Sequence, residues 1–217
     1  PKGLTMEEAA SIPLVGLTAW QALVTKANLQ QQQKVFIQAG SGGVGTFAIQ
    51  LAKHLGATVA TTASAGSAAL VKSLGADVVI DYKTQDFEDV LRDYDVVLNS
   101  QDGKTLDKSL RVLKEGGQLI SISGPPDPAF GQAIAANAFV KLALRLLSSG
   151  VRRKARSRGI AYAFLFMKAS GSQLREITQL IEAGAIRPVL DRIFPFESTN
   201  EALAYLETGR AKGKVVV

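Results

Sequence analysis

The sequence predicts an α/β fold in which six parallel strands form one doubly wound sheet with helices on both faces. Three observations support this prediction. Short apolar runs alternate with amphipathic segments over residues 34–123, a glycine-rich turn joins the first apolar run to the first amphipathic segment, and glycines follow most of the amphipathic segments. Continuous apolar strands separated by helices are typical of a parallel sheet that is covered on both faces.

The composition is that of a folded globular chain. Its 217 residues are 47% hydrophobic and 20% charged, which suits one large domain or one domain with part of another. No apolar run reaches the roughly 20 residues that a bilayer span needs, and no secretory leader is recognisable. The absence of cysteine excludes disulfides, thiolate catalysis and cysteine-ligated zinc within the chain, and it favours a cytoplasmic location. The net charge of +6 favours anionic partners, among them a phosphorylated cofactor, an acidic protein or a nucleic acid.

Two helices are expected ahead of the sheet. Thr5 and Glu8 have the spacing of a capping box, which predicts a helix start. Pro13 is expected to interrupt this segment, and Val15 to Ala27 then forms a second helix. The four glutamines from Gln30 to Gln33 fit a solvated turn before the first strand.

The remaining elements follow in a regular order. Strands are expected at 34–39, 57–62, 77–80, 94–99 and 118–123, with helices at 44–55, 67–74, 87–92 and 105–113. An apolar helix at 133–147, a sixth strand at 160–167, a helix at 172–183, an extended segment at 186–196, a helix at 199–208 and a last strand at 214–217 complete the chain. This alternation matches a six-stranded doubly wound sheet.

The turn Gly40-Ser41-Gly42-Gly43-Val44-Gly45 follows a predicted strand and opens a predicted helix. In this setting the first glycine makes a tight turn, the second admits a pyrophosphate close to the backbone, and the third allows the helix to pack on the strand. The free N–H groups and the positive dipole end of the helix then favour the phosphates. The turn predicts a dinucleotide site of the Rossmann type, but FAD enzymes use a similar turn, so the motif alone leaves the dinucleotide open.

The end of the second strand bears on that choice. NAD sites place an acidic residue there to bind the ribose hydroxyls, but the segment Thr61 to Ser67 has none, and the next acid is Asp77. Hydroxyl groups can donate to a 2′-phosphate, so the segment favours NADP(H). It lacks the Arg that usually binds such a phosphate, and Lys72 or Lys83 could take that part. The alternative interpretation is that this segment is an ordinary polar loop with no part in choosing the cofactor.

Several stretches of the chain resemble one family. Residues 39–53, with Ala39-Gly-Ser-Gly-Gly-Val-Gly at their start, are similar to the zinc-independent quinone oxidoreductase branch of the medium-chain dehydrogenase/reductase superfamily. Residues 74–82, 184–189 and 209–216 match the same branch, in its NADPH:quinone reductase or reticulon-4-interacting-protein-like type. The resemblance implies an NADP(H)-binding Rossmann domain over residues 1–185. Residues 186–217 would return to a catalytic domain of the chaperonin-10-like barrel type, whose body is absent from this sequence.

The resemblance also implies which residues hold the cofactor. Ser41, Gly43 and Val44 would contact the pyrophosphate within the turn that Gly40, Gly42 and Gly45 shape, and Ser64 and Tyr82 would hold the 2′-phosphate. Three serines at strand ends would line the nicotinamide side, two aromatic residues would lie near it, and a C-terminal turn would close on the cofactor; these are Ser100, Ser121, Ser123, Phe164, Phe166, Arg210, Ala211 and Lys212.

Some positions depart from the family pattern. Ser67 stands where a related bacterial reductase has Lys, and Asn99-Ser100-Gln101-Asp102 replaces the usual Asp-x-Val-Gly. Leu14 takes the place of a cysteine that zinc-dependent relatives use, and a single histidine, His54, remains. We therefore expect no metal site, and we expect His54 to lie on the surface in the last turn of a helix, where a cation is favoured.

The function that the resemblance implies is hydride transfer from NADPH to a quinone or an α,β-unsaturated carbonyl compound, without zinc. The expected partners are that small-molecule substrate and a second copy of the chain in a homodimer through the edge of the sheet, with no membrane. No catalytic residue can be named. Thr18 and Trp20 could approach the substrate, although packing in the core is the simpler role for Trp20.

A different class of function stays open at this point. Residues 152–158 carry five basic side chains, which would suit a non-catalytic NADPH-binding module that contacts RNA or a protein partner. No aromatic residue is interleaved with them, so a nucleic acid is not the expected partner, and a solvated helix or loop face is the simpler interpretation. The apolar segment 133–147 could form a lid, a subunit contact or part of the core.

Overall fold

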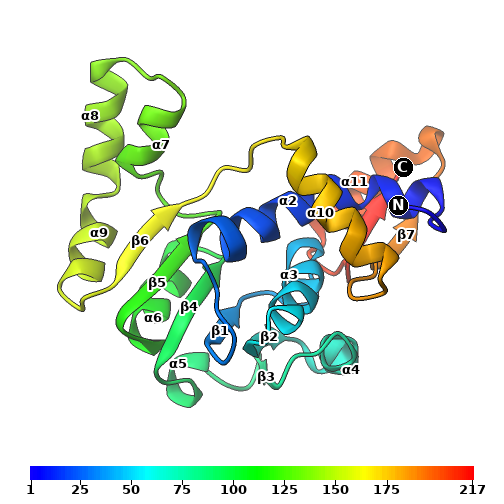
Figure 1. Cartoon of the computed structure of the whole chain (residues 1–217), viewed down its shortest axis with the longest axis horizontal. Coiled ribbons are helices and arrows are strands. Elements are labelled where there is room, and N and C mark those ends of the chain that lie inside the picture. Colours follow the sequence, from blue (N-terminus) through cyan, green and yellow to red (C-terminus); the bar gives the residue numbers. More distant parts are fainter.

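The computed structural model describes all residues from 1 to 217, and its centre is a six-stranded parallel sheet (Figure 1). The strands are β1 (Lys34–Ile37), β2 (Thr58–Ala63), β3 (Val78–Asp81), β4 (Tyr94–Asn99), β5 (Leu113–Ser121) and β6 (Ala161–Phe164). Their order across the sheet is β3-β2-β1-β4-β5-β6. This is the order of the doubly wound dinucleotide-binding fold, and it reverses direction between β1 and β4. The predicted fold class is confirmed.

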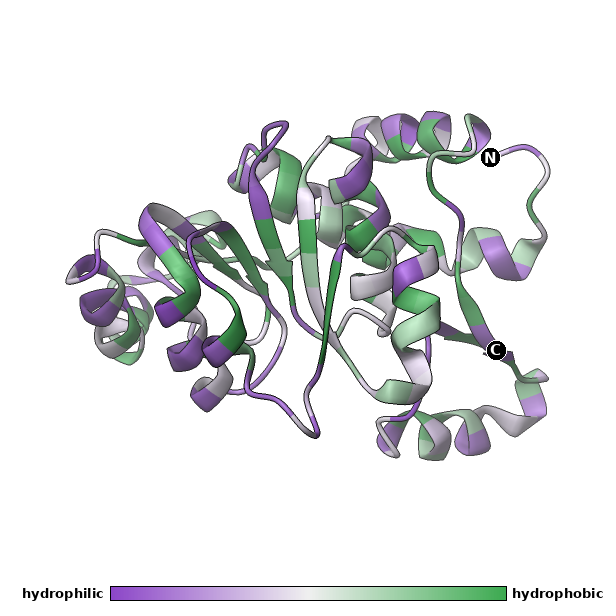
Figure 2. Cartoon of the chain, turned by 90° about the horizontal axis from the view of Figure 1, so that it is seen from below, coloured by the Kyte–Doolittle hydropathy of each residue, from purple (hydrophilic) through white to green (hydrophobic).

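Two hydrophobic cores lie on opposite faces of the sheet, because successive strand residues point to opposite sides. Val35 and Ile37 pack in the larger core, whereas Phe36 between them packs in the smaller one. The larger core lies under α2 (Ile12–Trp20), α3 (Gly43–His54), α4 (Ala68–Ser73) and α10 (Gly171–Glu182), and the smaller lies under α5 (Phe87–Val90), α6 (Gly103–Val112) and α9 (Ser149–Arg156). Figure 2 shows the hydrophobic colour concentrated in the central strands.

The start of the chain differs from its prediction at Pro13. The helix α1 (Met6–Ala10) begins at the expected capping box of Thr5 and Glu8. The first helix ends before Pro13 and a second one follows, as predicted, but α2 begins at Ile12 and not at Val15, so the proline lies in its first turn. A proline is tolerated there, since the missing N–H would have no partner in any case. The helix continues into a π-helical turn, η1 (Gln21–Lys26).

The predicted helix at 133–147 is also wrong as a single element. The structure has α7 (Pro128–Ala133) and α8 (Ala138–Leu147), separated where Ala135 has a φ of 50° and Asn137 caps the next helix. No residue of α8 is buried, so this segment is not part of the core. The basic run 152–158 falls largely in α9, which packs Val151 and Ala155 against the sheet.

The C-terminal residues form a small unit of their own. Strands β7 (Leu190–Ile193) and β8 (Lys214–Val216) pair in parallel as a second sheet, with α11 (Thr199–Glu207) between them. Two short 3₁₀ turns, η2 (Ala65–Ser67) and η3 (Phe196–Ser198), complete the list of elements. β6 ends at Phe164, before the expected Met167, and β5 starts at Leu113, where a helix was expected to end. None of the helices has both the length and the hydropathy to cross a bilayer.

Candidate functional site

The glycine turn connects β1 to α3 and is as tight as its sequence predicts. A Cβ atom on Gly40 would lie 2.1 Å from the hydroxyl oxygen of Thr61, and one on Gly45 would lie 2.3 Å from the carbonyl oxygen of Ala39. Both contacts are far inside van der Waals distance, so no larger residue fits at either position. The roles expected for Gly40 and Gly45, a tight turn and a close helix–strand approach, are therefore visible in the backbone itself.

The backbone of this turn leaves a set of N–H donors free. Gly40 donates to the carbonyl of Thr62 at 2.9 Å and Gly42 to that of Ala39 at 2.9 Å, but the N–H groups of Ser41 and Val44 have no acceptor within the chain. They lie at the start of α3, whose cap residue Gly42 offers no side chain. Free N–H groups at the positive end of a helix dipole form an anion-binding site.

A cleft opens beside this turn at the carboxyl ends of β1, β2 and β4. It has a volume of about 520 Å³, and its wall includes Ser41, Gly42, Tyr82 and Ala211, four of the residues that were expected to hold a cofactor. The cleft lies at the reversal of strand order, where ligands bind in folds of this kind. The structure thus brings residues separated by more than half of the chain into one concave site.

The end of β2 gains a positive charge from the C-terminus. Ala63 pairs with Asp81 across β2 and β3, so Ser64 and Tyr82, each one residue further on, lie at neighbouring strand ends. The ammonium group of Lys212 donates to the carbonyl of Gly66 at 2.9 Å in the turn that follows. Ser64 itself contacts Ser67 at 3.3 Å. Lys212 therefore brings a positive charge beside this acid-free segment, and the local sequence could not show this contact.

The C-terminal segment is attached directly to the glycine turn. Gly213 donates its N–H to the carbonyl of Ser41 at 2.8 Å, and Gly42 and Gly213 form an isolated parallel bridge. Gly213 has a φ of +105°, and a Cβ there would lie 2.4 Å from the carbonyl oxygen of Val189. Residue 213 can pack this closely against Val189 only because it is glycine. This contact accompanies the placement of Gly209 and Ala211 in the wall of the cleft.

A buried polar network holds the strand ends behind the cleft. The Asn99 amide donates to Gln38 Oε1 at 2.7 Å and accepts from the Ser121 hydroxyl at 2.6 Å. Gln38 in turn donates to Ser109 at 2.6 Å. All four side chains are buried, so the network ties β1, β4, β5 and α6 together. Sequence analysis missed Gln38 and noted Asn99 only as a departure from the family pattern; a glutamine at the end of an apolar strand was the available signal.

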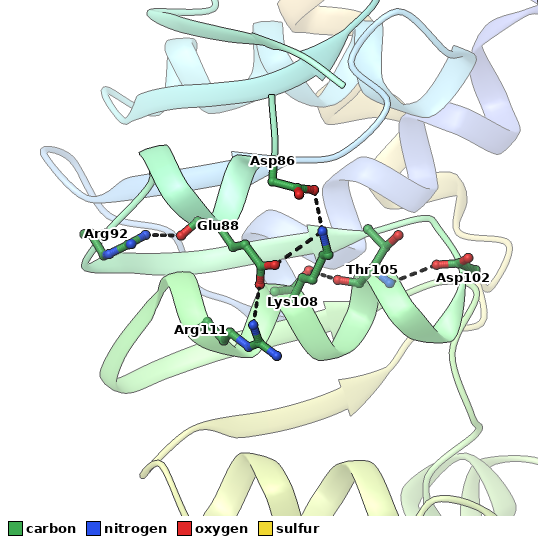
Figure 3. Close-up of polar contacts among 8 residues, drawn as sticks. Asp86, Glu88, Arg92, Asp102, Thr105, Lys108 and Arg111 are labelled. Atoms are coloured by element: carbon green, nitrogen blue, oxygen red, sulfur yellow. Dashed lines mark hydrogen bonds and ion pairs between the residues drawn. The ribbon is translucent and has the colours of Figure 1, made fainter. Parts of the chain in front are cut away.

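Charged side chains surround Lys108, which lines the cleft together with Asp86 and Asp102; Figure 3 shows their contacts. The Lys108 ammonium group contacts the carboxylates of Asp86 and Glu88, and Glu88 also pairs with Arg111 at 3.1 Å. The hydrogen bond from Lys108 to Asp86 raises the pKa of the lysine. Asp102 accepts the N–H of Thr105 at 2.8 Å as the cap of α6, and this bond lowers the pKa of its carboxyl group. Lys108 and Arg111 thus offset the charges of Asp86 and Glu88, whereas Asp102 has no ion-pair partner.

Not every expected residue lies in this cleft. Ser121 is fully buried, and its hydroxyl donates to Asn99 and accepts the N–H of Gly124. It therefore supports the strand ends from behind the cleft. Ser100 and Ser123 lie further out at the same strand ends. Phe164 and Phe166 line a different, largely apolar pocket with Phe130, whose lining shares no residue with the cleft.

Burial and contacts place the remaining residues that the sequence analysis named. His54 is exposed in the last turn of α3, as expected. Trp20 packs against the larger core, and the buried hydroxyl of Thr18 donates to the carbonyl of Leu14, so neither faces the cleft. Arg210 is exposed beside the cleft. No three His, Cys, Asp or Glu side chains come together in a way that could hold a metal ion.

Comparison with known proteins agrees with this geometry. The family described as zinc-binding dehydrogenase matches residues 74–217, which is about two thirds of the chain. The chain belongs to this family. The match begins after the glycine turn, so the turn and the family assignment support each other independently. This match confirms the family resemblance that the sequence motifs indicated. The family is described as zinc-binding, but no group of three His, Cys, Asp or Glu side chains that could hold a metal ion is found in this chain.

Individual relatives indicate which members of the family this chain resembles. All of this chain aligns at 37% identity with the NAD(P)H oxidoreductase RTN4IP1, mitochondrial, of Danio rerio, and at 36% with 2-methylene-furan-3-one reductase of Solanum lycopersicum. The alignment covers 58% and 48% of those proteins, so this family member spans about half the length of these curated relatives. The solved quinone oxidoreductase from Coxiella burnetii superposes on 99% of the chain with a TM-score of 0.83 at 31% identity, over 61% of its own length.

Proposed function

We propose that this chain is the NADPH-holding part of an oxidoreductase that reduces quinones or α,β-unsaturated carbonyl compounds by hydride transfer. The observation that carries the proposal is the cleft itself, whose wall includes Ser41 and Gly42 of the glycine turn together with Tyr82 and Ala211. Lys212, the residue after Ala211, adds a positive charge in the turn that follows β2, where it donates to Gly66. Relatives named as NAD(P)H oxidoreductase, alkenal/one oxidoreductase and quinone oxidoreductase support the same reaction class.

The pyrophosphate of the cofactor fits the start of α3. The N–H groups of Ser41 and Val44 would donate to its oxygens, and the absence of side chains at Gly40, Gly42 and Gly45 leaves room for the approach. When bound, NADPH supplies the hydride, and the protein supplies position and electrostatics. The buried Gln38–Asn99–Ser121 network keeps the strand ends in register, so that Ser100 and Ser123 can line the nicotinamide side.

The 2′-phosphate of NADPH fits the end of β2. Ser64 and Tyr82 offer hydroxyl groups there, and Lys212 offers a positive charge. An acidic residue at this place would repel the phosphate and bind the ribose hydroxyls of NADH instead. We therefore propose that Lys212, and neither Lys72 nor Lys83, is the cation that selects NADPH over NADH, with Arg210 and Ala211 closing the rim.

The substrate side of the reaction is proposed for the second pocket. Phe130 lies 5.3 Å from Phe164 and 5.7 Å from Phe166 between ring centroids, and these rings line an apolar pocket of about 350 Å³. A flat apolar ring such as a quinone or a nicotinamide packs well against aromatic faces. Phe164 and Phe166 thus remain our proposed aromatic neighbours of the nicotinamide.

The reaction is proposed to proceed without zinc. The chain has no cysteine, and its one histidine, His54, is exposed at the end of α3, away from any carboxylate cluster. Zinc sites need three or four His, Cys or carboxylate ligands in tetrahedral arrangement. Turnover of the whole protein should survive treatment with a strong chelator, and elemental analysis should find no stoichiometric zinc; loss of turnover that zinc restores would contradict this part of the proposal.

We further propose that residues 1–185 form the cofactor domain and that residues 186–217 pack against a catalytic, barrel-like domain. Ile193, Phe196 and Leu203 of the small C-terminal unit are 57%, 81% and 54% exposed, which is a large apolar surface for a short segment. In a longer protein that includes the barrel, Phe196 should be protected from side-chain oxidative labelling. Equal labelling of Phe196 in the short and long forms would contradict this division.

A homodimer and a cytoplasmic location are our remaining proposals. β6 is an edge strand that pairs only with β5, so a second copy can add its own β6 to continue the sheet. Sedimentation equilibrium should give twice the mass of one chain. Imaging of the tagged whole protein in its native cell tests the location. Five relatives are named as mitochondrial and one as chloroplastic, so staining of an organelle would contradict the cytoplasmic proposal.

The proposed reaction is tested with cofactor and substrate separately. Fluorescence titration should give a lower Kd for NADPH than for NADH, and the whole protein should oxidise NADPH when a quinone or an enone is added. Equal affinity for the two cofactors would remove the assignment of Ser64, Tyr82 and Lys212. NADPH binding without turnover of any quinone or enone in a broad panel would remove the oxidoreductase assignment.

A further inference from the structure

The carboxylate of Asp127 is buried where α7 begins, and it accepts two backbone N–H groups. Its Oδ1 accepts the N–H of Phe130 at 2.9 Å as the cap of α7, and its Oδ2 accepts the N–H of Phe164 at 3.1 Å. The residue is 7% exposed and takes part in no ion pair. A buried carboxylate is unfavourable unless its hydrogen bonds compensate the loss of water, so these two bonds fix the position of Asp127.

The N–H of Phe164 has no acceptor in the six-stranded sheet. Leu165, the next residue, donates to the carbonyl of Ser121 in β5 at 2.8 Å. Successive N–H groups of a strand point to opposite sides, so that of Phe164 points away from β5. β6 is the last strand of the sheet, and the acceptor on its outer side is the Asp127 carboxylate. The carboxylate therefore joins α7 to β6 in addition to capping α7.

The two residues that share this carboxylate also share a ring contact. Phe130 and Phe164 meet edge to face, with ring centroids 5.3 Å apart and an angle of 81° between the rings, and Phe166 lies 5.7 Å from Phe130. All three rings line the apolar pocket, whereas Asp127 itself does not. Asp127 and Phe164 are 37 positions apart in the sequence. The carboxylate thus holds together two segments whose rings form one wall of the pocket.

The same wall is held at its other end by Gln21. The side-chain amide of Gln21 donates to the Lys168 carbonyl at 2.7 Å and accepts the Lys168 N–H at 3.0 Å. Gln21 is buried and lines the pocket. Residues 164–168, which carry Phe164 and Phe166, are therefore tied at both ends by buried polar side chains. A wall fixed in this way has its shape before a ligand arrives, which lowers the cost of binding.

We propose that Asp127 is a positioning residue that makes this pocket select flat ring compounds, such as quinones, over acyclic enones. The inference rests on the proposed function, because it takes this pocket as the substrate side. Asp127 holds the backbones of Phe130 and Phe164 at the spacing that presents their rings to a flat ligand, and aromatic faces favour such a ligand. Every contact that carries the inference lies within one copy of the chain, so it depends neither on a second copy nor on a further domain.

The variant Asp127→Asn separates the two contacts of the carboxylate. Asparagine caps helices as well as aspartate does, but its side chain presents an NH2 group to one of the two N–H donors. In steady-state kinetics of the whole protein with NADPH, kcat/KM for menadione should fall about tenfold, mainly through KM, because a bond to a charged group is lost. The value for methyl vinyl ketone, which has no ring, should change by less than about twofold.

Asn137→Ala is the matched control. Asn137 accepts the N–H of Val140 at 2.9 Å as the cap of α8, and it does not line the pocket. The variant removes a cap from the same region of the chain and should leave the kinetics with both substrates unchanged. In both variants the Kd for 2′-phospho-ADP-ribose, which lacks the nicotinamide, should equal that of the parent. Equal loss of menadione selectivity in Asn137→Ala would overturn the proposal.

A double-mutant cycle shows whether Asp127 acts through the rings. Phe130→Leu removes one ring of the wall and should lower kcat/KM for menadione. If the carboxylate acts by placing this ring against Phe164, Asp127→Asn should cost less in the Phe130→Leu background than in the parent. Strictly additive losses would overturn the positioning role, because they would show that Asp127 affects turnover by another route.

Calorimetric titration with menadione in the absence of NADPH separates this inference from the proposed reaction. Binding without reduction, weakened in Asp127→Asn, would remove the oxidoreductase assignment and support the positioning role. Reduction of both compounds with the same ratio of kcat/KM in parent and Asp127→Asn would keep the reaction and overturn the positioning role. A parent protein that neither binds nor reduces menadione would overturn both.

Discussion

The ammonium group of Lys212 lies 2.9 Å from the carbonyl oxygen of Gly66, although 146 positions separate the two residues. Through this contact the C-terminal segment brings a cation to the end of β2, where the local sequence has hydroxyl groups and no acid. Gly213, the next residue, is bonded to Ser41 of the glycine turn. One short segment therefore reaches both the proposed pyrophosphate site and the proposed 2′-phosphate site.

Removal of this cation should weaken NADPH binding selectively. We expect Lys212→Met to raise the Kd for NADPH about ten- to a hundredfold, since a hydrogen bond to a charged group contributes roughly 1.5–3 kcal/mol. The Kd for NADH should not change, because NADH has no 2′-phosphate. Fluorescence titration measures both. Lys72→Met is the matched control and should leave both values unchanged, whereas a similar loss for NADH in Lys212→Met would point to a general disturbance of the cleft.

The third glycine of the turn should tolerate no side chain. In Gly45→Ala the new Cβ would meet the Ala39 carbonyl and the Gly40 backbone, neither of which is a flexible side chain. We expect a loss of about 1–3 kcal/mol in the free energy of unfolding, as in other overpacked sites, together with loss of NADPH binding. Gly150→Ala in α9 is the matched control: its Cβ meets nothing within 4 Å, so urea unfolding should show a gain of about 0.5–1 kcal/mol.

The contributions of Gln38 and Asn99 to the free energy of unfolding should depend strongly on each other. Asn99→Leu would leave Gln38 and Ser121 without their partner in a fully buried place, and each unsatisfied group costs about 1–3 kcal/mol. Urea unfolding of Asn99→Leu, of Gln38→Leu and of the double variant gives a double-mutant cycle. We expect the double variant to lose less than the sum of the two single losses. Strict additivity would show that the two side chains do not act together.

The stability of the fold should fall at alkaline pH through Tyr162. Burial raises the pKa of this phenol above its ordinary value of 10.0, with a further contribution from Asp127. The folded state thus keeps a proton that the unfolded chain releases, so the stabilisation is complete below pH 10.0 and is lost as the pH rises through and beyond it.

Tyr162→Phe tests that dependence. The variant loses the hydrogen bond from Tyr162 to the Pro125 carbonyl, about 0.5–1.5 kcal/mol, but its unfolding free energy should decline less steeply at high pH. A smaller decline should remain, because burial also raises the pKa of Tyr94. A series of urea unfolding curves measures both slopes, and identical slopes for parent and variant would contradict the role of Tyr162.

Local sequence rules were sufficient for most of the sheet. The strands of the fold were recognisable as apolar runs such as Val35 to Ile37, and Gly40, Gly42 and Gly45 marked the turn because their conformational demands are local. The predictions failed where the same local sequence feature is compatible with two different structures. Pro13 breaks a helix in its interior but starts one in its first turn, and the apolar residues of 133–147 cannot show by themselves whether anything covers them.

The sequence by itself determined the six-stranded α/β fold, the tight glycine turn and the absence of an acid at the end of β2, because each depends on the covalent properties of a few adjacent residues. The tertiary structure decided which basic side chain lies near the acid-free strand end, which side chains Asn99 contacts, and that no residue of α8 is buried. Those features arise from contacts between residues far apart in the chain, such as Lys212 with Gly66 and Asn99 with Gln38, and no local pattern encodes such distances.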